Sequence, residues 1–310
     1  MEIWAKSNGL PLKKHTTDVL NAIDNLPFDK LDYNKLKIDK EYIKNLLQHA
    51  GFFHDLGKIS PTFQKKIGNL TLPSEILNFP DIRHNILSLF FINKEKVKEV
   101  CKNKEGLYTS FLSAIAFHHW KQDEKKYFLQ IDNNLIRTAE LLLKNNNGTN
   151  LAEMLKQHFG NFQVNGNNVN DYIQFDENLA IHIFKKGDLI SANILPPYTL
   201  YFLPEKLKVE IELKINLNLW IFLSGFLMRA DHFASFVESQ EHTSITLSEI
   251  EKCITNLSLE NKLEKNFGDA FWQKELVKNL KNNNIIFIAP TGIGKTEFAF
   301  LWAENEKFFY

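Results

Sequence analysis

Five separate stretches of the chain carry histidine or aspartate at positions that fall on the apolar face of a helix. His15 precedes Val19 and Ile23 at spacings of four and eight residues, which place the three side chains on one side of a helix. Burying an imidazole or a carboxylate is costly unless the group finds a partner, so these polar groups constrain how the helices pack. The polar residues of the five stretches are His15, His54 with Asp55, His84, His118 with His119, and Asp231.

In the other four stretches, too, the polar residue lies three or four positions from apolar residues. The sets are Leu47, Ala50 and His54; His84, Leu87 and Phe91; Leu112, Ile115 and His119; and Trp220, Leu227 and Asp231. We therefore expect a mainly helical domain with these polar side chains directed inward. A single inward histidine is more often a hydrogen-bonded core residue than a ligand, but five independent stretches favour one shared metal site.

A pair of divalent cations would satisfy all of these groups at once. His54 and Asp55 point about 100° apart around a helix, so the imidazole can face one cation while the two carboxylate oxygens bridge to a second. Imidazole ligands favour Mn, Fe, Co or Ni, and Mg is the less favoured alternative. Two-metal centres of this kind hydrolyse phosphate esters, which is the reaction we expect.

Composition agrees with a folded enzyme and argues against several other classes of protein. The 310 residues are 44% hydrophobic and the formal net charge is zero, so contacts with nucleic acid have to come from local lysines or bound metals. Cys101 and Cys253 form no CxxC motif, which predicts neither disulfides nor a zinc knuckle. The first residues do not have the apolar core of a signal peptide, and the apolar residues 217–228 are too few to span a bilayer. We expect a cytoplasmic protein with no membrane contact.

The pattern of elements predicts three regions. Residues 1–240 hold the histidine and aspartate stretches, and include an irregular insertion over about residues 158–214 in which prolines interrupt the helical spacing and short strands are expected. Residues 241–268 are polar and predict a linker or a connecting helix. Residues 269–310 predict an incomplete α/β segment, with a strand at 285–288. The Asn-rich residues 145–150 and 165–170 predict surface loops.

The sequence APTGIGKT at residues 289–296 predicts a phosphate-binding loop between a strand and a helix. Its glycines let backbone N–H groups approach phosphate, its lysine neutralises the β- and γ-phosphates, and its last threonine can bind Mg. No acidic Mg-binding motif or arginine finger follows before Tyr310, so we expect a fragment of a longer enzyme that neither hydrolyses ATP nor unwinds DNA alone. The candidate residues for binding ATP with Mg are Thr291, Gly292, Gly294, Lys295 and Thr296.

Taken in order, the histidines and aspartates resemble the HD-superfamily nuclease domain of the CRISPR-associated helicase–nuclease of type I interference systems. The resemblance covers about residues 1–240, and includes the doubled histidine at 118–119 and an Ala-Asp-x-x-x-Ser ending at residues 230–235. It implies a helical domain that cuts single-stranded DNA, an RNA-guided CRISPR targeting complex as a partner, and two groups of metal ligands. The first ligand group is His15, His54, Asp55 and Asp231, and the second is Asp55, His84, His118 and His119.

The resemblance also implies roles for four residues outside the ligand groups. Lys58, in the sequence HDLGK at residues 54–58, and Ser235 match positions that contact substrate phosphate or support the site. We expect Ser235 to support Asp231; the competing interpretation of Lys58 is an exposed lysine at a helix end. Ala289 resembles the first position of motif I in superfamily 2 helicases, and Gln273 resembles the glutamine that reads adenine in those enzymes.

The leading hypothesis is a metal-dependent nuclease of single-stranded DNA that acts in CRISPR antiviral interference, as part of a longer ATP-driven helicase–nuclease. Two other functions stay open. A nucleotide phosphohydrolase or cyclic-dinucleotide phosphodiesterase would use the same histidine and aspartate chemistry, but usually has no fused phosphate loop such as the one around Lys295. A non-catalytic docking module would hold the metals for structural reasons only.

Overall fold

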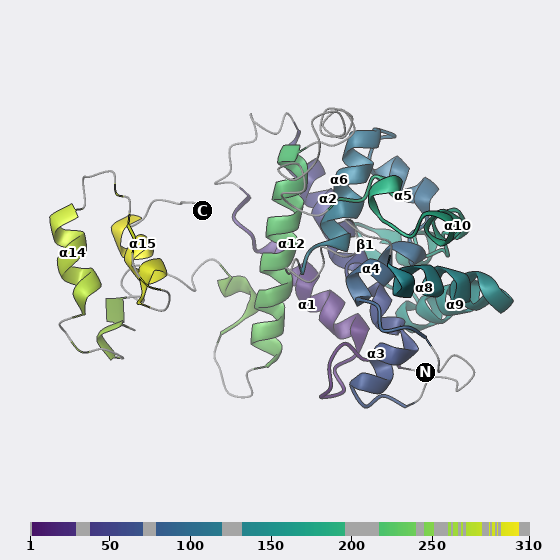
Figure 1. The fold of residues 1–310 in the computed structure, drawn as a ribbon, viewed down its shortest axis with the longest axis horizontal. Helices are drawn as coiled ribbons and strands as arrows, with labels where there is room; N and C mark the ends of the chain where they lie inside the picture. Colours follow the sequence, from purple (N-terminus) through teal and green to yellow (C-terminus); the bar gives the residue numbers. More distant parts are fainter. Residues whose placement is uncertain are drawn as a thin grey trace. The chain divides into compact units, whose positions relative to one another are not determined.

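A computed structural model describes residues 2–28, 38–70, 79–119, 132–195, 217–239 and 245–250, and in the last part of the chain residues 260–261, 263–265, 268, 271–280, 285, 287–288, 290 and 293–303. The chain separates into two compact units, residues 1–248 and residues 249–310. The first unit is mainly helical in its described residues, which confirms the predicted class. Figure 1 shows its helices coloured by their position along the sequence.

The regular elements of the described residues are short to medium helices with one small hairpin. The α-helices up to residue 238 are α1 (Leu12–Asp24), α2 (Lys40–Phe53), α3 (Pro61–Lys66), α4 (His84–Ser88), α5 (Lys94–Val100), α6 (Glu105–Ala116), α8 (Asn133–Leu143), α9 (Asn147–Phe159), α10 (Glu177–Lys186) and α12 (Leu217–Glu238). The 3-10 helices are η3 (Leu56–Ile59), η5 (Leu89–Phe91), η7 (Lys144–Asn146), η8 (Val169–Asp171), η9 (Ile190–Ala192) and η11 (Leu247–Glu249). Strands β1 (Gln163–Val164) and β2 (Asn167–Asn168) pair antiparallel.

Aspartate side chains cap the start of several helices. Asp39 accepts a hydrogen bond from the backbone N–H of Tyr42 at the start of α2, and Asp132 accepts two from the first turn of α8. These caps satisfy backbone donors that have no partner within the helix. Gly187 ends α10 with a φ of 76°, a left-handed conformation that glycine adopts without strain.

Helices α1, α2, α6 and α12 pack against one another and form the part of the core that carries the polar residues. In Figure 1, α12 runs alongside α1. Leu219, Leu223 and Leu227 of α12 are fully buried, whereas Ile221 and Met228 on its other side are exposed. The buried face of α12 is therefore the one that brings Asp231 into the interior.

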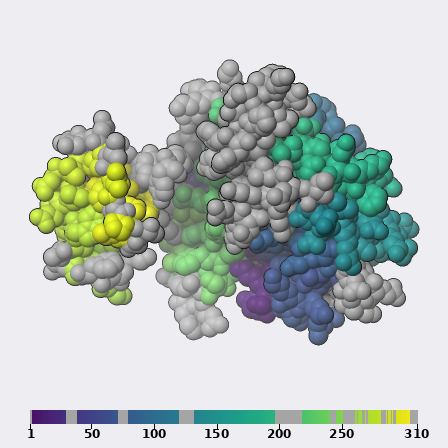
Figure 2. All heavy atoms as spheres, viewed as in Figure 1, coloured from purple at the N-terminus to yellow at the C-terminus, as the bar shows by residue number. Residues whose placement is uncertain are grey.

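Helices α8, α9 and α10 form a second packed group within the same unit. Phe52 of α2 contacts the ring of Phe159 of α9 at a centroid distance of 5.1 Å, and Phe53 contacts Phe111 of α6 at 6.1 Å. These edge-on ring contacts join α2 to α9 on one side and to α6 on the other. In the space-filling view, the teal atoms of this group form a continuous surface with the blue atoms of earlier segments (Figure 2).

A close backbone contact at Gly57 joins η3 to α4. The backbone N–H of Gly57 donates to Ser88 Oγ at 2.8 Å, and that hydroxyl lies 2.9 Å from the carbonyl oxygens of both His54 and His84. A Cβ atom at Gly57 would lie 2.0 Å from the carbonyl oxygen of His84, so only glycine fits at this position. The contact brings the chain around Asp55 next to the start of α4.

Two local expectations differ from the structure. Residues 147–150 begin α9 rather than a surface loop, and Asn145 and Asn146, with φ of 54° and 57°, make the bend before the helix. The short strands expected in the insertion are present as β1 and β2, joined by a two-residue turn at Asn165 and Gly166, but α10 is a regular helix where irregular structure was expected. Residues 196–216 of the insertion lie outside the described residues.

The described part of the second unit includes two helices with assigned bounds, and residues 260–261 and 263–265 are helical as well. Helices α14 (Trp272–Leu280) and α15 (Lys295–Ala303) pack together, and the ring of Trp272 stacks on those of Phe287 and Phe298. The strand expected at residues 285–288 is not confirmed, because Ile285, Phe287 and Ile288 lie in no strand and residue 286 is not described. Much of the predicted connection at 241–268 also lies outside the described residues.

No helix in the described part of the chain has both the length and the apolar character needed to cross a membrane.

Replacing Gly57 by alanine should force η3 and α4 apart. We expect a loss of about 1 to 3 kcal/mol in the free energy of unfolding, at the upper end of that range because the clash is with backbone atoms. Chemical denaturation measures the change. The matched control is Gly225→Ala in α12, where a Cβ would meet nothing within 4 Å and alanine should stabilise by about 0.5 to 1 kcal/mol. Equal stability of the two variants would contradict this account of Gly57.

Candidate metal centre

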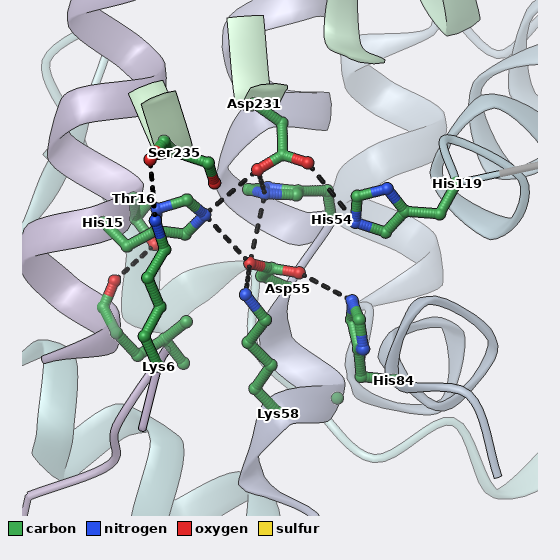
Figure 3. Close-up of polar contacts among 12 residues, drawn as sticks. Lys6, His15, Thr16, His54, Asp55, Lys58, His84, His119, Asp231 and Ser235 are labelled. Atoms are coloured by element: carbon green, nitrogen blue, oxygen red, sulfur yellow. Dashed lines mark hydrogen bonds and ion pairs between the residues drawn. The ribbon is translucent and has the colours of Figure 1, made fainter. Parts of the chain in front are cut away.

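Five elements of the first unit bring the predicted ligands together. α1 contributes His15, the turn between α2 and η3 holds His54 and Asp55, α4 begins with His84, the turn after α6 holds His118 and His119, and α12 contributes Asp231. Their candidate ligand atoms form two groups of four residues, and His119 and Asp231 also form a smaller group with the exposed His232; within each group these atoms lie within 4.8 Å of one another. Figure 3 labels these residues except His118 and shows their side chains converging from separate parts of the chain. The two groups have the same members as those that the family resemblance implied.

Asp55 belongs to both groups, and its two oxygens face different histidines. Oδ2 lies 3.2 Å from His15 Nε2 and 3.3 Å from His54 Nε2, whereas Oδ1 lies 3.1 Å from His84 Nε2 (Figure 3). The carboxylate therefore lies between histidines of the first ligand group and a histidine of the second, and presents one oxygen to each side. This is the arrangement that a bridging ligand between two cations requires.

Asp231 also faces both groups, which the sequence did not indicate. Its Oδ1 lies 3.2 Å from His15 Nε2, and its Oδ2 lies 3.3 Å from His119 Nε2. Sequence reasoning placed Asp231 only in the first group, because nothing along the chain shows which way each carboxylate oxygen points. Together the two aspartates line both sides of the cluster of imidazoles.

Hydrogen bonds at Nδ1 prepare two of the histidines to bind a cation through Nε2. His54 Nδ1 lies 2.7 Å from the carbonyl oxygen of Gly51, and His118 Nδ1 lies 2.7 Å from that of Ile115. A carbonyl only accepts, so Nδ1 carries the hydrogen and Nε2 of the neutral ring keeps a free electron pair. The Nε2 atoms of His54, His84 and His118 are buried and make no hydrogen bond of acceptable geometry. Such orphaned nitrogens fit a site built for metal ions.

Buried negative charge dominates the electrostatics of the first ligand group. Burial alone would lower the pKa of His15, but hydrogen bonds to Asp231, Asp55 and Glu238 outweigh it and raise this pKa to about 10. Burial likewise opposes ionisation of Asp55, yet His54 and Lys58 hold the pKa of Asp55 well below its ordinary value. The carboxylates therefore stay ionised inside the protein and require positive charge beside them, from protons or from cations.

In the second ligand group, the pKa values of the histidines are lowered rather than raised. Burial lowers the pKa of His84, and burial together with the neighbouring His119 places the pKa of His118 well below its ordinary value. Burial also lowers the pKa of His119 to about 4. These three imidazoles are therefore neutral at physiological pH, which is the state that binds metal.

Lys58 is buried, so its interpretation as an exposed lysine at a helix end is wrong. Only 7% of the residue is exposed, and its Nζ lies 2.5 Å from Asp55 Oδ2 (Figure 3). It lies in η3, held in place by the contact of Gly57 with α4. Its ammonium group compensates the charge of the shared carboxylate.

Ser235 lies one turn after Asp231 on α12 and takes part in the site through its backbone. Its carbonyl oxygen accepts a hydrogen bond from Lys6 Nζ at 3.2 Å (Figure 3). The expectation that its side chain supports Asp231 stays a prediction.

The helical spacing that placed His119 on an inward face does not apply. α6 ends at Ala116, and Phe117, with a φ of −123°, turns the chain out of the helix. His118 and His119 lie in that turn, where His118 is buried and the side chain of His119 is 25% exposed. Asn85 of α4 donates a hydrogen bond to the carbonyl oxygen of Ala116, which fixes the end of α6 against α4.

Sequence reasoning missed three residues next to the ligands. Glu238, to which the sequence analysis gave no role, contacts His15 Nδ1 at 2.9 Å and Lys6 Nζ at 2.6 Å. His232 is exposed, and its ring stacks on that of His119 at a centroid distance of 5.7 Å. The spacing of seven residues places Glu238 on the same helix face as Asp231, so the sequence could have indicated its role. The partners of Lys6 and His232 leave no such pattern in the sequence.

The predicted phosphate loop is described only in part. Thr291 and Gly292 lie outside the described residues. Gly294 has a φ of 91°, Lys295 Nζ donates to the carbonyl oxygen of Pro290 at 3.2 Å, and Thr296 is exposed in the first turn of α15. Gln273 is buried, and its side-chain amide lies 3.5 Å from the carbonyl oxygens of Ile293 and Gly294. The predicted adenine-reading glutamine is therefore adjacent to the loop.

Comparison with known proteins finds a relative whose alignment covers nearly the whole chain. The chain is 26% identical over 346 aligned positions to the CRISPR-associated nuclease/helicase Cas3 of Methanothermobacter thermautotrophicus, an alignment that covers 99% of this chain. The chain spans 38% of the length of that relative. No solved structure matches the chain.

The family comparison covers the part of the chain that carries every candidate metal ligand. Residues 4–239 match the family described as Cas3, HD domain. The match begins before α1 and ends just after α12, the two helices that supply His15 and Asp231. The chain therefore belongs to the Cas3 HD domain family.

Proposed function

We propose that residues 1–240 form a metal-dependent nuclease that hydrolyses phosphodiester bonds of single-stranded DNA. The observation that carries the proposal is the pair of ligand groups that share Asp55, each with imidazole nitrogens facing one carboxylate oxygen. Membership of the Cas3 HD domain family and a relative named a CRISPR-associated nuclease/helicase support DNA as the substrate. We extend the proposal to CRISPR antiviral interference with an RNA-guided targeting complex, within a longer ATP-driven helicase–nuclease.

In this proposal the first cation is held by His15, His54, Asp55 and Asp231, and the second by Asp55, His84, His118 and His119. The five imidazoles favour Mn, Fe, Co or Ni over Mg. When bound, the cations polarise phosphoryl oxygens and make a bound water more acidic. Asp55 sets the separation of the two groups, and the Nδ1 hydrogen bonds of His54 and His118 keep their Nε2 atoms directed inward.

Substrate reaches the centre most directly from the side of His84 and His119. Their side chains are 18% and 25% exposed, whereas that of Asp231 is 4% exposed. Lys58 lies beside the shared carboxylate with 9% of its side chain exposed, so its ammonium group can attract a phosphate that enters the centre. On this side, the negatively charged DNA backbone meets the ammonium group of Lys58 in addition to the metals.

The nucleotide-binding part of the proposal concerns Lys295, Thr296 and Gln273 in the second unit. Lys295 at the start of α15 and Gln273 at the start of α14 flank the loop around Gly294. We propose that they bind ATP with Mg in the longer enzyme, together with Thr291 and Gly292. In this chain, cleavage is independent of nucleotide, because the metal ligands all lie in residues 15–231.

Replacing Asp55 by alanine should lower the metal content from two ions toward none, or leave one ion weakly bound. The substitution removes the only carboxylate present in both ligand groups. Elemental analysis of the purified protein measures the content. Asp24→Ala is the matched control, because Asp24 pairs with Lys44 at the surface. An unchanged metal content in Asp55→Ala would rule out the bridging role.

Cleavage should be at least about tenfold faster on single-stranded DNA than on a fully paired duplex of the same sequence. Opening one base-pair step costs about 1.4 kcal/mol in lost stacking, which corresponds to about tenfold in rate. Rates on labelled strands with and without the complementary strand give the ratio. Comparable rates on the two substrates would count against the preference.

Cleavage should require a transition metal and proceed without ATP. His119→Ala should lower the rate by at least about 10- to 100-fold, because even residues that only support metal ligands commonly have effects of this size. Lys295→Ala and the surface control His182→Ala should leave the rate unchanged, and chelation should abolish it. The proposal that the nuclease is independent of the phosphate loop fails if Lys295→Ala reduces cleavage as strongly as His119→Ala, or if ATP is required.

A further inference from the structure

Glu238, the last residue of α12, connects the candidate metal centre to the start of the chain. Its carboxylate oxygens lie 2.9 and 3.0 Å from His15 Nδ1, and one of them lies 2.6 Å from Lys6 Nζ. The side chain of Glu238 is only 5% exposed. A buried carboxylate held by two cationic or hydrogen-bonding partners is part of a defined network rather than a solvated helix end.

The hydrogen bond between Glu238 and His15 determines which nitrogen of His15 can bind a cation. A carboxylate only accepts, so Nδ1 of His15 donates to it. Nε2 is then the nitrogen that faces Asp55 and Asp231, at 3.2 Å from an oxygen of each. When the ring is positively charged, Nε2 carries its second proton, and a cation can take the place of that proton only at this nitrogen.

His15 differs in this respect from His54 and His118. Those two histidines donate from Nδ1 to neutral carbonyl oxygens three residues earlier in their own turns, at Gly51 and Ile115. His15 instead donates to a charged side chain 223 residues later in the chain. A charged acceptor makes the imidazole a stronger electron donor than a neutral one does.

The geometry of α12 explains how one helix holds both edges of the His15 ring. Asp231 and Glu238 are seven residues apart, which places them on the same face about 10.5 Å apart along the axis. Lys6 fixes the end of this face, because its Nζ contacts both Glu238 and the carbonyl oxygen of Ser235. The first residues of the chain thus hold Glu238 in place and compensate its charge.

We propose that Glu238 is a positioning residue that orients His15 and strengthens it as a ligand of the first ligand group, with Lys6 holding the carboxylate. This inference rests on the proposed function, since His15 needs a cation to bind. Removing the carboxylate should weaken binding at His15, His54, Asp55 and Asp231. It should leave the second ligand group unaffected, because the interactions of Glu238 among the described residues are with His15, Lys6 and Asp18 and not with His84, His118 or His119.

Calorimetric titration of the metal-free chain with cobalt(II) tests the inference. The unsubstituted chain should bind two ions. Glu238→Gln keeps the shape and removes the charge, and should weaken one of the two binding steps by about 10-fold; Glu238→Ala should weaken the same step by up to about 100-fold. Glu99→Gln, which alters an exposed pair with Lys96, is the matched control and should change neither step.

Thermal unfolding of the metal-free variants separates positioning from a purely structural link between α1 and α12. A structural link alone predicts a lower unfolding temperature with both binding constants unchanged. That result, with two ions bound by the unsubstituted chain, overturns the role of Glu238 and leaves the proposed function standing. A chain that binds no cobalt in its unsubstituted form contradicts the proposed function itself, and this inference with it. If Glu238→Ala does not fold, the nearly isosteric Glu238→Gln decides alone.

Discussion

The rest of the centre depends on the burial of the Asp55 carboxylate. It is buried between two sets of imidazoles, and each of its oxygens faces a different set. An ionised group at this depth is stable only when positive charge surrounds it. Lys58 provides part of that charge at 2.5 Å. The remaining demand explains why His15, His54 and His84 lie next to this carboxylate, whereas Asp231 adds negative charge and increases the demand.

The two ligand groups meet this demand in different ways. In the first group, three carboxylates surround His15 and raise its pKa, so a proton occupies the position that a cation would take. In the second group, burial keeps His84, His118 and His119 neutral, with their electron pairs available. In the proposed metal centre, cations would displace protons from the first group, whereas the second group would bind as folded. A centre of this kind contains one strongly anionic and one weakly charged half.

Backbone contacts between short elements decide how the histidines meet. Gly57 allows η3 to touch α4, and Ser88 joins the carbonyl oxygens of His54 and His84 through one hydroxyl. Asn85 fixes α4 against the end of α6, next to His118. The second ligand group thus depends on packing between an α-helix of five residues, a 3-10 helix and a turn, whose own local stability is low.

The family resemblance implied the two groups of candidate ligands, and the sequence by itself determined the helical class and the inward direction of His15, His54 and Asp231. These follow from spacing along single helices, where a period of 3.6 residues fixes the face on which a side chain lies. The sequence could not determine the burial of Lys58, the turn that carries His119, or the second contact of Asp231. Only the tertiary structure decided these features, together with the network of Lys6, Glu238 and His15. The physical reason is that burial and side-chain contacts depend on how segments distant in the chain pack together, with partners up to 223 positions apart, and no local periodicity records that packing.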